Sequence, residues 1–459
     1  MKWLYNLALY FAAVLSSPWW LYRLATSARY RSGLGERLGR VPARLRAGEK
    51  LRCIWLHAVS VGEVLACGQL LAELRQAYPE HAIVISTTTA VGQRLARERH
   101  GEENVFYFPL DFGWAIRPYL RALQPQLVIM AETEFWPNFL RLARMHGAQI
   151  AVVNGRISDR SLPGYRRWRW FLRHVLANIS LFLAQSEEDR RRLVEIGAPA
   201  ARVYVSGNLK FDVRAPETAP IVAQLRKAIP PESPVIVCGS TVDEEEFLLW
   251  GALQGVLKEF PGALMILAPR RPERFDKVAA LAAGVGAGMP ERSRELAGMP
   301  RMNFWRRSDL PAGEQLYGGV LLLDSIGELA SVYSLATLVF VGGSLVPRGG
   351  HNILEPAHFG KPILVGPHTE NFRDVTSIFL AAGALRVVRG FRDGRQKGDL
   401  GEAMRELLRN PAEREVLGRR AAEVMHAHAG ATARTVAALS QLMLPQPLFA
   451  ELAAVERVW

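Results

Sequence analysis

Short apolar runs that end in polar residues recur along the first half of the chain. Residues 51–58, 81–86, 126–131 and 149–153 are runs of this kind, and helical patterns follow the first two of them. Their lengths are typical of buried strands, and the alternation predicts βα units in a parallel sheet. Because ligands bind at the carboxyl ends of strands in such sheets, the polar residues after each run are the candidates for chemistry.

The same order of elements starts again after a proline-rich stretch. A strand at 235–238 and a helix at 244–257 repeat the order of elements at 51–74. We therefore predict two similar α/β domains joined by a linker. The expected segments are a first domain at 51–212, the linker at 213–232, a second domain at 233–425, and a closing helical segment at 426–459 that packs on the first domain.

The pattern of the N-terminal segment is typical of a membrane anchor. Residues 3–21 are almost wholly apolar, close to the roughly 20 residues that span a bilayer. Aromatic residues that favour the membrane interface stand at both ends of this run: Trp3, Trp19, Trp20 and Tyr22. We predict an anchor at 1–22, and both a spanning helix and a helix lying in the interface remain open.

The segment after the anchor, 23–50, is strongly basic. Its arginines are Arg23, Arg29, Arg31, Arg37, Arg40, Arg44 and Arg46. By the positive-inside rule, this juxtamembrane segment places the body of the protein on the cytoplasmic side of the membrane, where phospholipid is a partner. A cleaved signal peptide is disfavoured because the basic charge follows the apolar run.

The length, net charge and cysteine content of the chain limit the number of domains and the kinds of partner that we expect. The length of 459 residues suits two domains, and the net charge of +13 suits anionic lipid or an acidic substrate. Nucleic acid is not an expected partner, since no zinc-knuckle, helix-turn-helix or aromatic-basic pattern occurs. The three cysteines are far apart and form no CxxC motif, which indicates a reducing compartment, and inert buried thiols at Cys53 and Cys238.

A glycine-rich segment at 340–356 is the sharpest motif of the second half. Two glycine pairs follow an apolar strand and precede His351-Asn352-Ile353-Leu354-Glu355. Glycines let a backbone approach an oxyanion closely, and a helix that starts beyond them offers free N–H groups. Glu355, expected one turn into that helix, can accept hydrogen bonds from both ribose hydroxyls. The segment therefore predicts a nucleotide-sugar site rather than a turn that serves packing alone.

Two other strand ends of the second half carry candidate ligand residues. Arg270, just past a strand, suits a phosphate or carboxylate, because a guanidinium donates two parallel hydrogen bonds. The segment 324–329 opens a helix, where Gly327 and its neighbours can meet a base or phosphate through backbone N–H groups. Each of these two segments is equally compatible with a solvated turn.

Carboxylates mark the strand ends of the first half. Glu63, at a helix start, either complements the helix dipole or acts as the general base for an acceptor hydroxyl. Glu132 and Glu134 form a second acidic strand end, and Arg156, at a third, suits an anionic acceptor. The acids at 187–189 are better interpreted as a first helical turn behind an N-cap.

The chain has no DxD motif of the kind that holds a metal on a pyrophosphate. This pattern fits a donor with one phosphate, and we expect neither a metal nor a cofactor. A single carboxylate base favours direct displacement with inversion.

Eight motifs in order resemble one bacterial family, the 3-deoxy-D-manno-oct-2-ulosonic acid (Kdo) transferases. They are LHAVSVGE (56–63), ISTTTAVG (85–92), YFPLD (107–111), AETEFWPN (131–138), NGRIS (154–158), SGNLKFD (206–212), PRRPERF (269–275) and GGHNILEP (349–356). The resemblance runs from the N-terminal anchor to about residue 380. It implies a GT-B fold, in which two Rossmann-like domains face a cleft.

The resemblance also implies an inverting transfer of Kdo from CMP-Kdo to the lipid A precursor, lipid IVA, at the bacterial inner membrane. Glu63 matches the family's catalytic base. The matched CMP-binding positions are Pro269, Arg270, Ile326, Gly327, Glu328, Asn352, Ile353, Leu354 and Glu355. The candidate acceptor contacts are Ser60, Arg156 and Lys210.

Two alternatives from other classes remain open at this point. Another GT-B transferase or a nucleotide-sugar 2-epimerase shares glycine turns and a ribose-binding glutamate, although an epimerase has no need for the anchor. A membrane-surface scaffold that binds phospholipid through its basic face is a non-enzymatic alternative.

Overall fold

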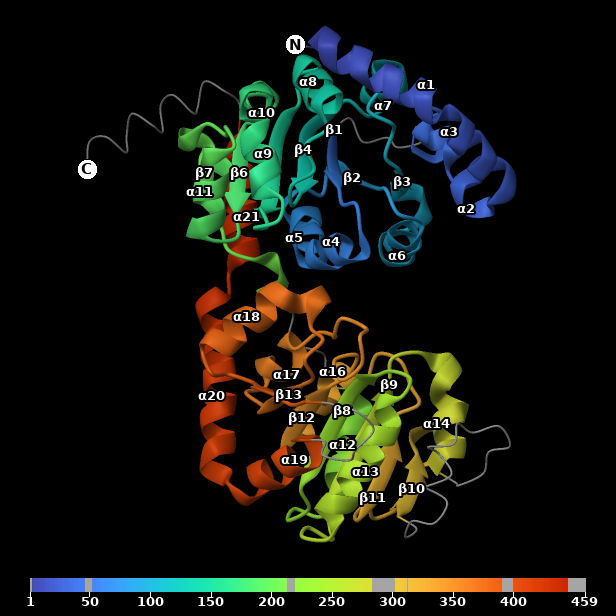
Figure 1. Ribbon diagram of the computed structural model, residues 1–459, viewed down its shortest axis with the longest axis vertical. Coiled ribbons are helices and arrows are strands. Elements are labelled where there is room, and N and C mark those ends of the chain that lie inside the picture. The colour runs from blue at the N-terminus through green and yellow to red at the C-terminus, as the bar shows by residue number, and fades with distance from the viewer. Residues whose placement is uncertain are drawn as a thin grey trace, which may run out of the picture. The chain divides into compact units, whose positions relative to one another are not determined.

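The computed structural model describes residues 2–45, 52–212, 219–282, 302–311, 313–389 and 399–444. The chain divides into two compact units (Figure 1). Unit 1 comprises Met1–Asp212 and His428–Trp459, and unit 2 comprises Val213–Ala427. Parts of the predicted juxtamembrane segment, linker and closing segment, and the stretch 283–301, lie outside the described residues. Each unit is an α/β structure with a parallel sheet, which confirms the prediction of two such domains.

The sheet of unit 1 has seven strands among the described residues, in the order β3-β2-β1-β4-β5-β6-β7. Their bounds are β1 Arg52–His57, β2 His81–Thr87, β3 Val105–Tyr107, β4 Pro125–Ala131, β5 Gln149–Gly155, β6 Leu181–Ala184 and β7 Val203–Val205. All pairs are parallel, with Trp55 of β1 opposite Val84 of β2 and Val128 of β4. Because helices cover both faces, the central strands β1, β2, β4 and β5 are buried along almost their whole length rather than at alternate positions.

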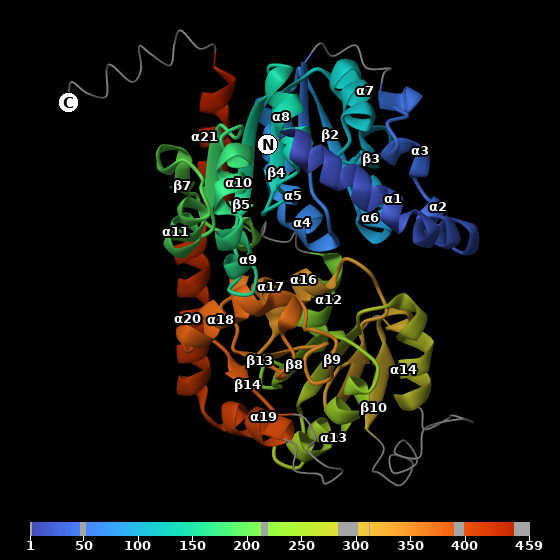
Figure 2. The same cartoon turned by 45° about the horizontal axis from the view of Figure 1, so that its top comes forward.

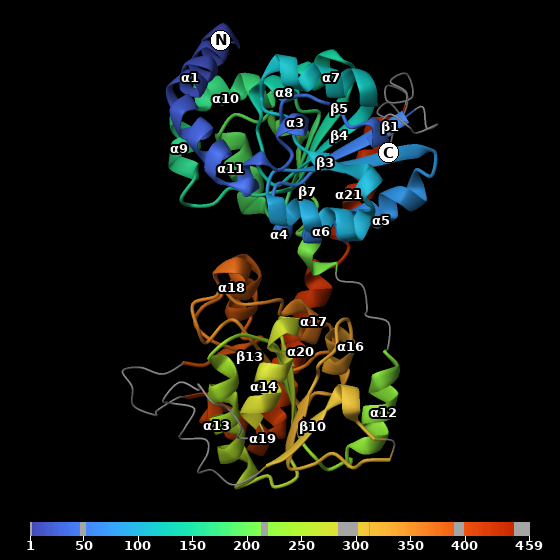
Figure 3. The ribbon, with the colours of Figure 1, turned by 90° about the vertical axis from the view of Figure 1, so that its right-hand side faces the viewer.

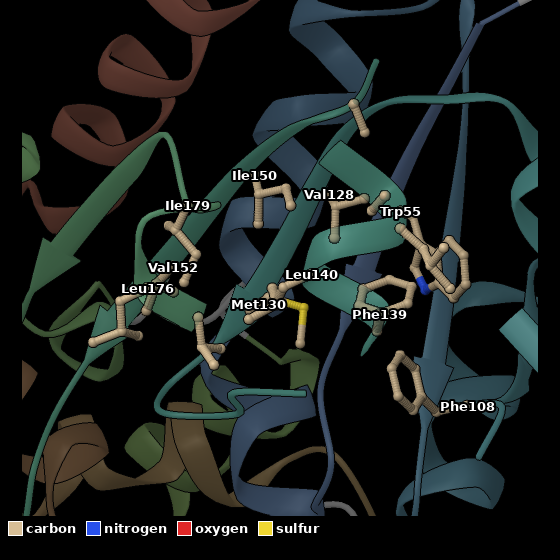
Figure 4. Packing of buried hydrophobic residues seen from close by; sticks show 14 of the residues in the cluster. Trp55, Phe108, Val128, Met130, Phe139, Leu140, Ile150, Val152, Leu176 and Ile179 are labelled. Carbon is tan, nitrogen blue, oxygen red and sulfur yellow. The ribbon is translucent and has the colours of Figure 1, made fainter. Parts of the chain in front are cut away.

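Helices cover both faces of this sheet. Their bounds are α4 Val61–Ala66, α5 Gly68–Ala77, α6 Ala90–His100, α7 Gly113–Leu123, α8 Pro137–Met145, α9 Leu162–Arg167, α10 Arg169–Leu176, α11 Glu187–Glu195 and α21 Ala431–Met443, with 3-10 turns η2 Glu102–Asn104, η3 Ala200–Arg202 and η4 Leu209–Phe211. Side chains of α7, α8 and α10 pack on one face around Trp55 and Phe139 (Figure 4). Side chains of α4, α5, α6 and α21 form the core on the other face. Ser186 caps α11 by accepting the N–H of Asp189, which confirms the N-cap interpretation.

The C-terminal segment belongs to unit 1 through a specific contact. The Asp212 carboxylate accepts the N–H of Gly430 at 2.7 Å and that of Thr432, at the start of α21. Arg434 donates to the Ser206 carbonyl at 2.8 Å, and the Phe211 and His428 rings stack at 4.6 Å. These contacts therefore join the end of the first chain segment of unit 1 to the beginning of its second segment.

The sheet of unit 2 also has seven strands among the described residues, in the order β10-β11-β9-β8-β12-β13-β14. Their bounds are β8 Val235–Thr241, β9 Leu264–Pro269, β10 Asn303–Arg306, β11 Gly319–Leu322, β12 Leu338–Val341, β13 Ile363–Val365 and β14 Arg386–Val387. Ile236 of β8 lies opposite Met265 of β9 and Leu338 of β12.

Helices again lie on both sides of the sheet. Their bounds are α12 Pro220–Ala228, α13 Glu245–Leu257, α14 Phe275–Ala282, α16 Leu329–Val332, α17 Leu354–His358, α18 Arg373–Ala381, α19 Asp399–Arg409 and α20 Pro411–His428, with 3-10 turns η5 Pro272–Arg274, η7 Arg307–Asp309, η8 Tyr333–Leu335 and η9 Glu370–Phe372. Residues of α13 and α19 form the core of one face, and α12 and α16 lie on the opposite side from α13 (Figure 3). Helix α20 runs along the β13–β14 edge (Figure 2).

The proline-rich stretch predicted as a linker contains helix α12. Pro220 occupies the first turn of this helix, where its missing N–H and fixed φ are no cost. Ile221, Val222 and Leu225 are buried in unit 2. Pro220 therefore begins a helix of unit 2, and the stretch 213–232 is not a connection along its whole length.

Helix α1 (Lys2–Thr26) packs on unit 1 through polar and aromatic contacts. The Tyr5 hydroxyl donates to Asp111 at 2.8 Å, and Asn138 donates to Asn6 at 2.7 Å. Tyr5 stacks on Phe171 of α10 at 5.8 Å. Among the residues that the structure describes, no helix is both long and apolar enough to cross a bilayer.

The residues after α1 fold back against strand β3. They form α2 (Ala28–Arg31), α3 (Leu34–Arg37) and η1 (Ala43–Leu45). The Glu36 carboxylate accepts the Tyr107 N–H at 2.7 Å and pairs with Arg44 at 2.7 Å. Arg37 donates to the Thr88 carbonyl at 2.5 Å and lies over the Tyr107 ring. Arg37 and Arg44 thus bind their own chain.

Candidate active site

Glu63 lies in the first turn of α4, directly after strand β1 of unit 1. Ser60 caps this helix, and its hydroxyl donates to one Glu63 carboxylate oxygen at 2.8 Å. The Val59 N–H donates to the other oxygen at 2.7 Å. The residue is 8% exposed, and the two hydrogen bonds fix the orientation of its carboxylate.

The surroundings of Glu63 bring its titration to neutral pH. Burial raises its pKa to about 7, because it disfavours the ionised form. The hydrogen bonds from Ser60 and Val59 oppose this rise, and the negative charges of Glu132 and Glu134 add to it. A carboxylate in this state accepts a proton more readily at neutral pH than an ordinary glutamate does.

Glu132 and Glu134 follow strand β4, the neighbour of β1 in the sheet. Glu132 has φ +56°, which is strained for a residue with a side chain, and its N–H donates to the Val153 carbonyl at 2.9 Å. Burial, and then the charge of Glu132, raise the pKa of Glu134, while Trp136 opposes the rise. The structure thus places three carboxylates at adjacent strand ends, which the sequence had suggested only as separate acidic motifs.

Arg156 and Lys210, two candidate acceptor contacts, lie at the same edge of the unit 1 sheet as Ser60 and Glu63. Arg156 follows β5 and Lys210 lies in turn η4 after β7; both are half-buried. Asn154, with φ +55°, accepts the Leu209 N–H at 3.0 Å and so fixes the turn that carries Lys210. Leu209 shares a core cluster with Val64 of α4, which brings this turn against the helix of Glu63.

In unit 2, Arg270 and Glu355 come together from different strand ends. Pro269 ends β9, and the Arg270 N–H donates to the Thr241 carbonyl at 2.8 Å, with the side chain exposed. Burial raises the pKa of Glu355, whereas a hydrogen bond from Asn352 at 3.1 Å and the charge of Arg270 oppose the rise. Glu355 therefore offers carboxylate oxygens that can accept hydrogen bonds from hydroxyl groups, and Arg270 offers a positive charge beside them.

His351 joins this group, although sequence reasoning did not select it as a ligand. Burial, and then the charge of Arg270, lower its pKa to about 4, so the ring is neutral at physiological pH. Its Nε2 atom has no hydrogen-bond partner among the described residues. A neutral ring nitrogen next to an arginine is a donor or acceptor suited to a polar ligand.

The helix after the glycines begins later than expected. Helix α17 begins at Leu354 and has five residues, so Glu355 lies in its first turn rather than one turn in. The Asn352 side chain accepts the Leu354 N–H at 3.1 Å and also donates to Glu355. Ile353 and Leu354 are buried, so their side chains are not open to a ligand.

Glu245 holds the first glycine pair, and sequence reasoning missed it. One carboxylate oxygen accepts the N–H groups of Ser344 and Leu345, both at 2.9 Å. The other accepts those of Gly343 at 2.7 Å and Val242 at 3.1 Å. The oxyanion that this loop was expected to bind is therefore supplied by the chain itself.

Glu246, the next residue, fixes the loop that carries Arg270. It accepts hydrogen bonds from Thr241 at 3.2 Å and from Arg274 at 2.9 Å. Both glutamates are at most 2% exposed. Two consecutive buried acids at the start of α13 thus connect the ends of β8, β9 and β12.

Ile326, Gly327 and Glu328 form the turn after β11, next to β9. Ile326 is 79% exposed and Gly327 has φ +89°. The Glu328 carboxylate accepts two hydrogen bonds from Arg307, at 2.8 and 2.7 Å, and one from Ser325. Glu328 is therefore occupied within the protein, and the exposed part of the turn is its backbone and Ile326.

Comparison with known proteins assigns the family. A family model described as 3-deoxy-D-manno-octulosonic-acid transferase (kdotransferase) matches residues 32–213. A 3-deoxy-D-manno-octulosonic acid transferase of Bordetella pertussis is 36% identical over 440 residues, covering 92% of this chain and 94% of that protein. One from Haemophilus influenzae is 32% identical over 412 residues, covering 89% and 91%. This chain belongs to the Kdo transferase family.

The Kdo transferases are glycosyltransferases, and this membership decides against the epimerase and scaffold alternatives. Solved structures with a similar fold include a UDP-GlcNAc 2-epimerase from Neisseria meningitidis, 14% identical with a TM-score of 0.52, covering 85% of this chain and all (100%) of that chain. A glycosyltransferase from Rickettsia africae is 11% identical with a TM-score of 0.50, covering 86% and 98%. These likenesses show a GT-B-like fold and nothing about the reaction.

The role of Glu245 in shaping the Kdo transferase glycine loop can be tested by unfolding. In Glu245→Gln, an amide nitrogen replaces one acceptor oxygen, so buried N–H groups lose their partner. We expect the free energy of unfolding to fall by about 1–3 kcal/mol in urea denaturation. Asp243→Asn, which removes an exposed charge two residues away, is the control and should change it by less than about 1 kcal/mol. Equal stability of Glu245→Gln and wild type would contradict this role.

Proposed function

We propose that this Kdo transferase moves Kdo from CMP-Kdo to lipid IVA, the lipid A precursor, with inversion and release of CMP. The observation that carries the proposal is Glu63, a buried carboxylate with a pKa of about 7, fixed by two hydrogen bonds at a strand end. In unit 2, Arg270 offers a positive charge to the donor's single phosphate, and Glu355 offers acceptor oxygens to ribose hydroxyls.

In the proposed reaction, Glu63 takes the proton of an acceptor hydroxyl as that oxygen attacks the anomeric carbon of Kdo. The new carbon–oxygen bond forms on the face opposite the phosphate, and the bond to the phosphate breaks. CMP leaves with that electron pair and its negative charge, which Arg270 stabilises. Ser60, Arg156 and Lys210 are proposed to contact the acceptor, and the last two can pair with its phosphates.

The direct test is transfer of labelled Kdo, supplied as CMP-Kdo generated in situ, onto lipid IVA by the purified protein, with and without chelator. We expect labelled lipid in both conditions, because the proposed displacement uses a carboxylate base and an arginine. A reaction without acceptor is the control. A folded protein that binds CMP and yet labels no lipid would overturn the assignment of sugar or acceptor.

The base role of Glu63 predicts a specific pH profile. Only the ionised carboxylate accepts a proton, so kcat/KM should rise from pH 5, pass its midpoint near pH 7 and level off at higher pH. Glu63→Gln should lower kcat by about 10²–10⁴-fold and abolish this dependence. Glu80→Gln, an exposed site of unit 1, is the matched control. Near wild-type turnover in folded Glu63→Gln would show that another group is the base.

We further propose that α1 lies in the membrane interface, on the cytoplasmic side of the inner membrane. The helix turns its polar residues inward: Tyr5 and Asn6 bind Asp111 and Asn138. Its outward face is apolar, with side chains 66–77% exposed at Trp3, Leu4, Leu7, Phe11, Val14 and Leu15. Apolar residues at helical spacing, facing away from the fold, suit the boundary between headgroups and acyl chains.

Charging this face should release the protein from lipid. The double variant Leu7→Glu/Phe11→Glu should reduce co-sedimentation with anionic phospholipid vesicles by about tenfold or more, because two apolar groups no longer leave water. Tyr204→Glu, which charges an exposed aromatic site on β7, should bind as wild type does. Unchanged sedimentation of the double variant would refute this placement of α1.

A further inference from the structure

The turn Asp324–Glu328 has an unsupported tip. Ile326 is 79% exposed, and a Cβ built on Gly327 meets nothing within 4 Å. Gly327 has φ +89°, a conformation that few other residues adopt. The shape of the tip therefore depends on what holds the two ends of the turn.

The C-terminal end of the turn is held by Arg307. Its Nε and one terminal nitrogen donate to the two Glu328 oxygens at 2.8 and 2.7 Å, in a bidentate pair. The Ser325 hydroxyl donates to the same carboxylate, so this one acid joins both sides of the tip. The hydrogen bonds from Arg307 are the main reason that the pKa of Glu328 is lowered.

The N-terminal end is held by the residues on either side of Arg307. Asp324, whose side chain is 2% exposed, accepts the Arg306 Nε–H at 2.9 Å. It also accepts the backbone N–H and the hydroxyl of Ser308, at 2.9 and 2.8 Å. The segment 306–308, at the end of β10 and the start of η7, thus fixes the turn after β11 at both ends.

We infer that Arg307 is a positioning residue for the nucleotide donor. By fixing Glu328, it sets the conformation in which the backbone at Ile326 and Gly327 meets the nucleotide. The inference rests on the proposed function, because it takes CMP-Kdo as the donor. Arg307 itself points its guanidinium at a protein carboxylate, so it acts through the turn.

Bidentate geometry makes the identity of this side chain matter. A guanidinium holds a carboxylate in one orientation through two parallel hydrogen bonds, whereas an ammonium acts as a point charge. Arg307→Gln removes the charge and the fork, and Arg307→Lys keeps only the charge. Graded effects of these two variants on nucleotide binding therefore separate positioning from a general loss of stability.

The test compares CMP binding by calorimetry, and kcat and KM for CMP-Kdo, in full-length variants. For Arg307→Gln we expect the Kd for CMP and the KM for CMP-Kdo to rise about tenfold. The kcat should stay within about twofold of the wild-type value, because the variant weakens binding of the nucleotide and leaves the groups that carry out the reaction unchanged. Arg307→Lys should fall between this variant and wild type. The matched control is Arg409→Gln, which breaks another bidentate pair of unit 2, with Glu259 at 2.8 and 2.6 Å, and should bind CMP normally.

The outcomes distinguish this inference from the proposed function. Wild-type protein that binds CMP, together with folded Arg307→Gln that binds it equally well, would overturn the inference alone. Equal losses in Arg307→Gln and Arg409→Gln would also overturn it, since the effect would then be general. Wild-type protein that binds no CMP would overturn the proposed donor and this inference with it. If Arg307→Gln does not fold, Arg307→Lys is compared with wild type and Arg409→Gln in the same way, and the expected loss of CMP binding is smaller.

Discussion

The candidate site depends on one requirement: backbone N–H groups buried at strand ends must find acceptors. In unit 2, the Glu245 carboxylate satisfies four of them and thereby fixes the glycine loop after β12. Such loops cannot be held by apolar packing alone, because glycine has no side chain.

In unit 1, a carboxylate again accepts a backbone N–H after a strand, but here the carboxylate also has a proposed role in the reaction. The Glu63 carboxylate accepts the Val59 N–H, so the acid that holds the loop is also the group proposed to take a proton. Burial keeps its pKa near neutrality, while the two hydrogen bonds limit that rise. If the loop were fixed by another acceptor, Glu63 would lose its defined orientation, and if it received more donors, it would become a weaker base.

The sequence predicts the strands that are long and apolar well, since a buried parallel strand leaves a continuous hydrophobic run. It does not reveal β3 and β7, which have three residues each and depend on their neighbours in the sheet. The candidate residues at strand ends were found because the topology places such ends at one edge. Glu245 and Arg307 were missed because their partners are distant in sequence: Gly343 lies 98 residues beyond Glu245. Periodicity within one element carries no information about such pairs.

The contact between Asp212 and the start of α21 has a consequence for the order in which the protein matures. Unit 2 is inserted into the chain of unit 1, and Ala431 and Leu439 of α21 complete the core on one face of the first sheet. During synthesis, the ribosome delivers this helix only after all of unit 2 has been made. The sheet that carries Glu63 therefore stays partly uncovered until translation is almost finished, and a chain cut short before α21 exposes that apolar face to chaperones and proteases.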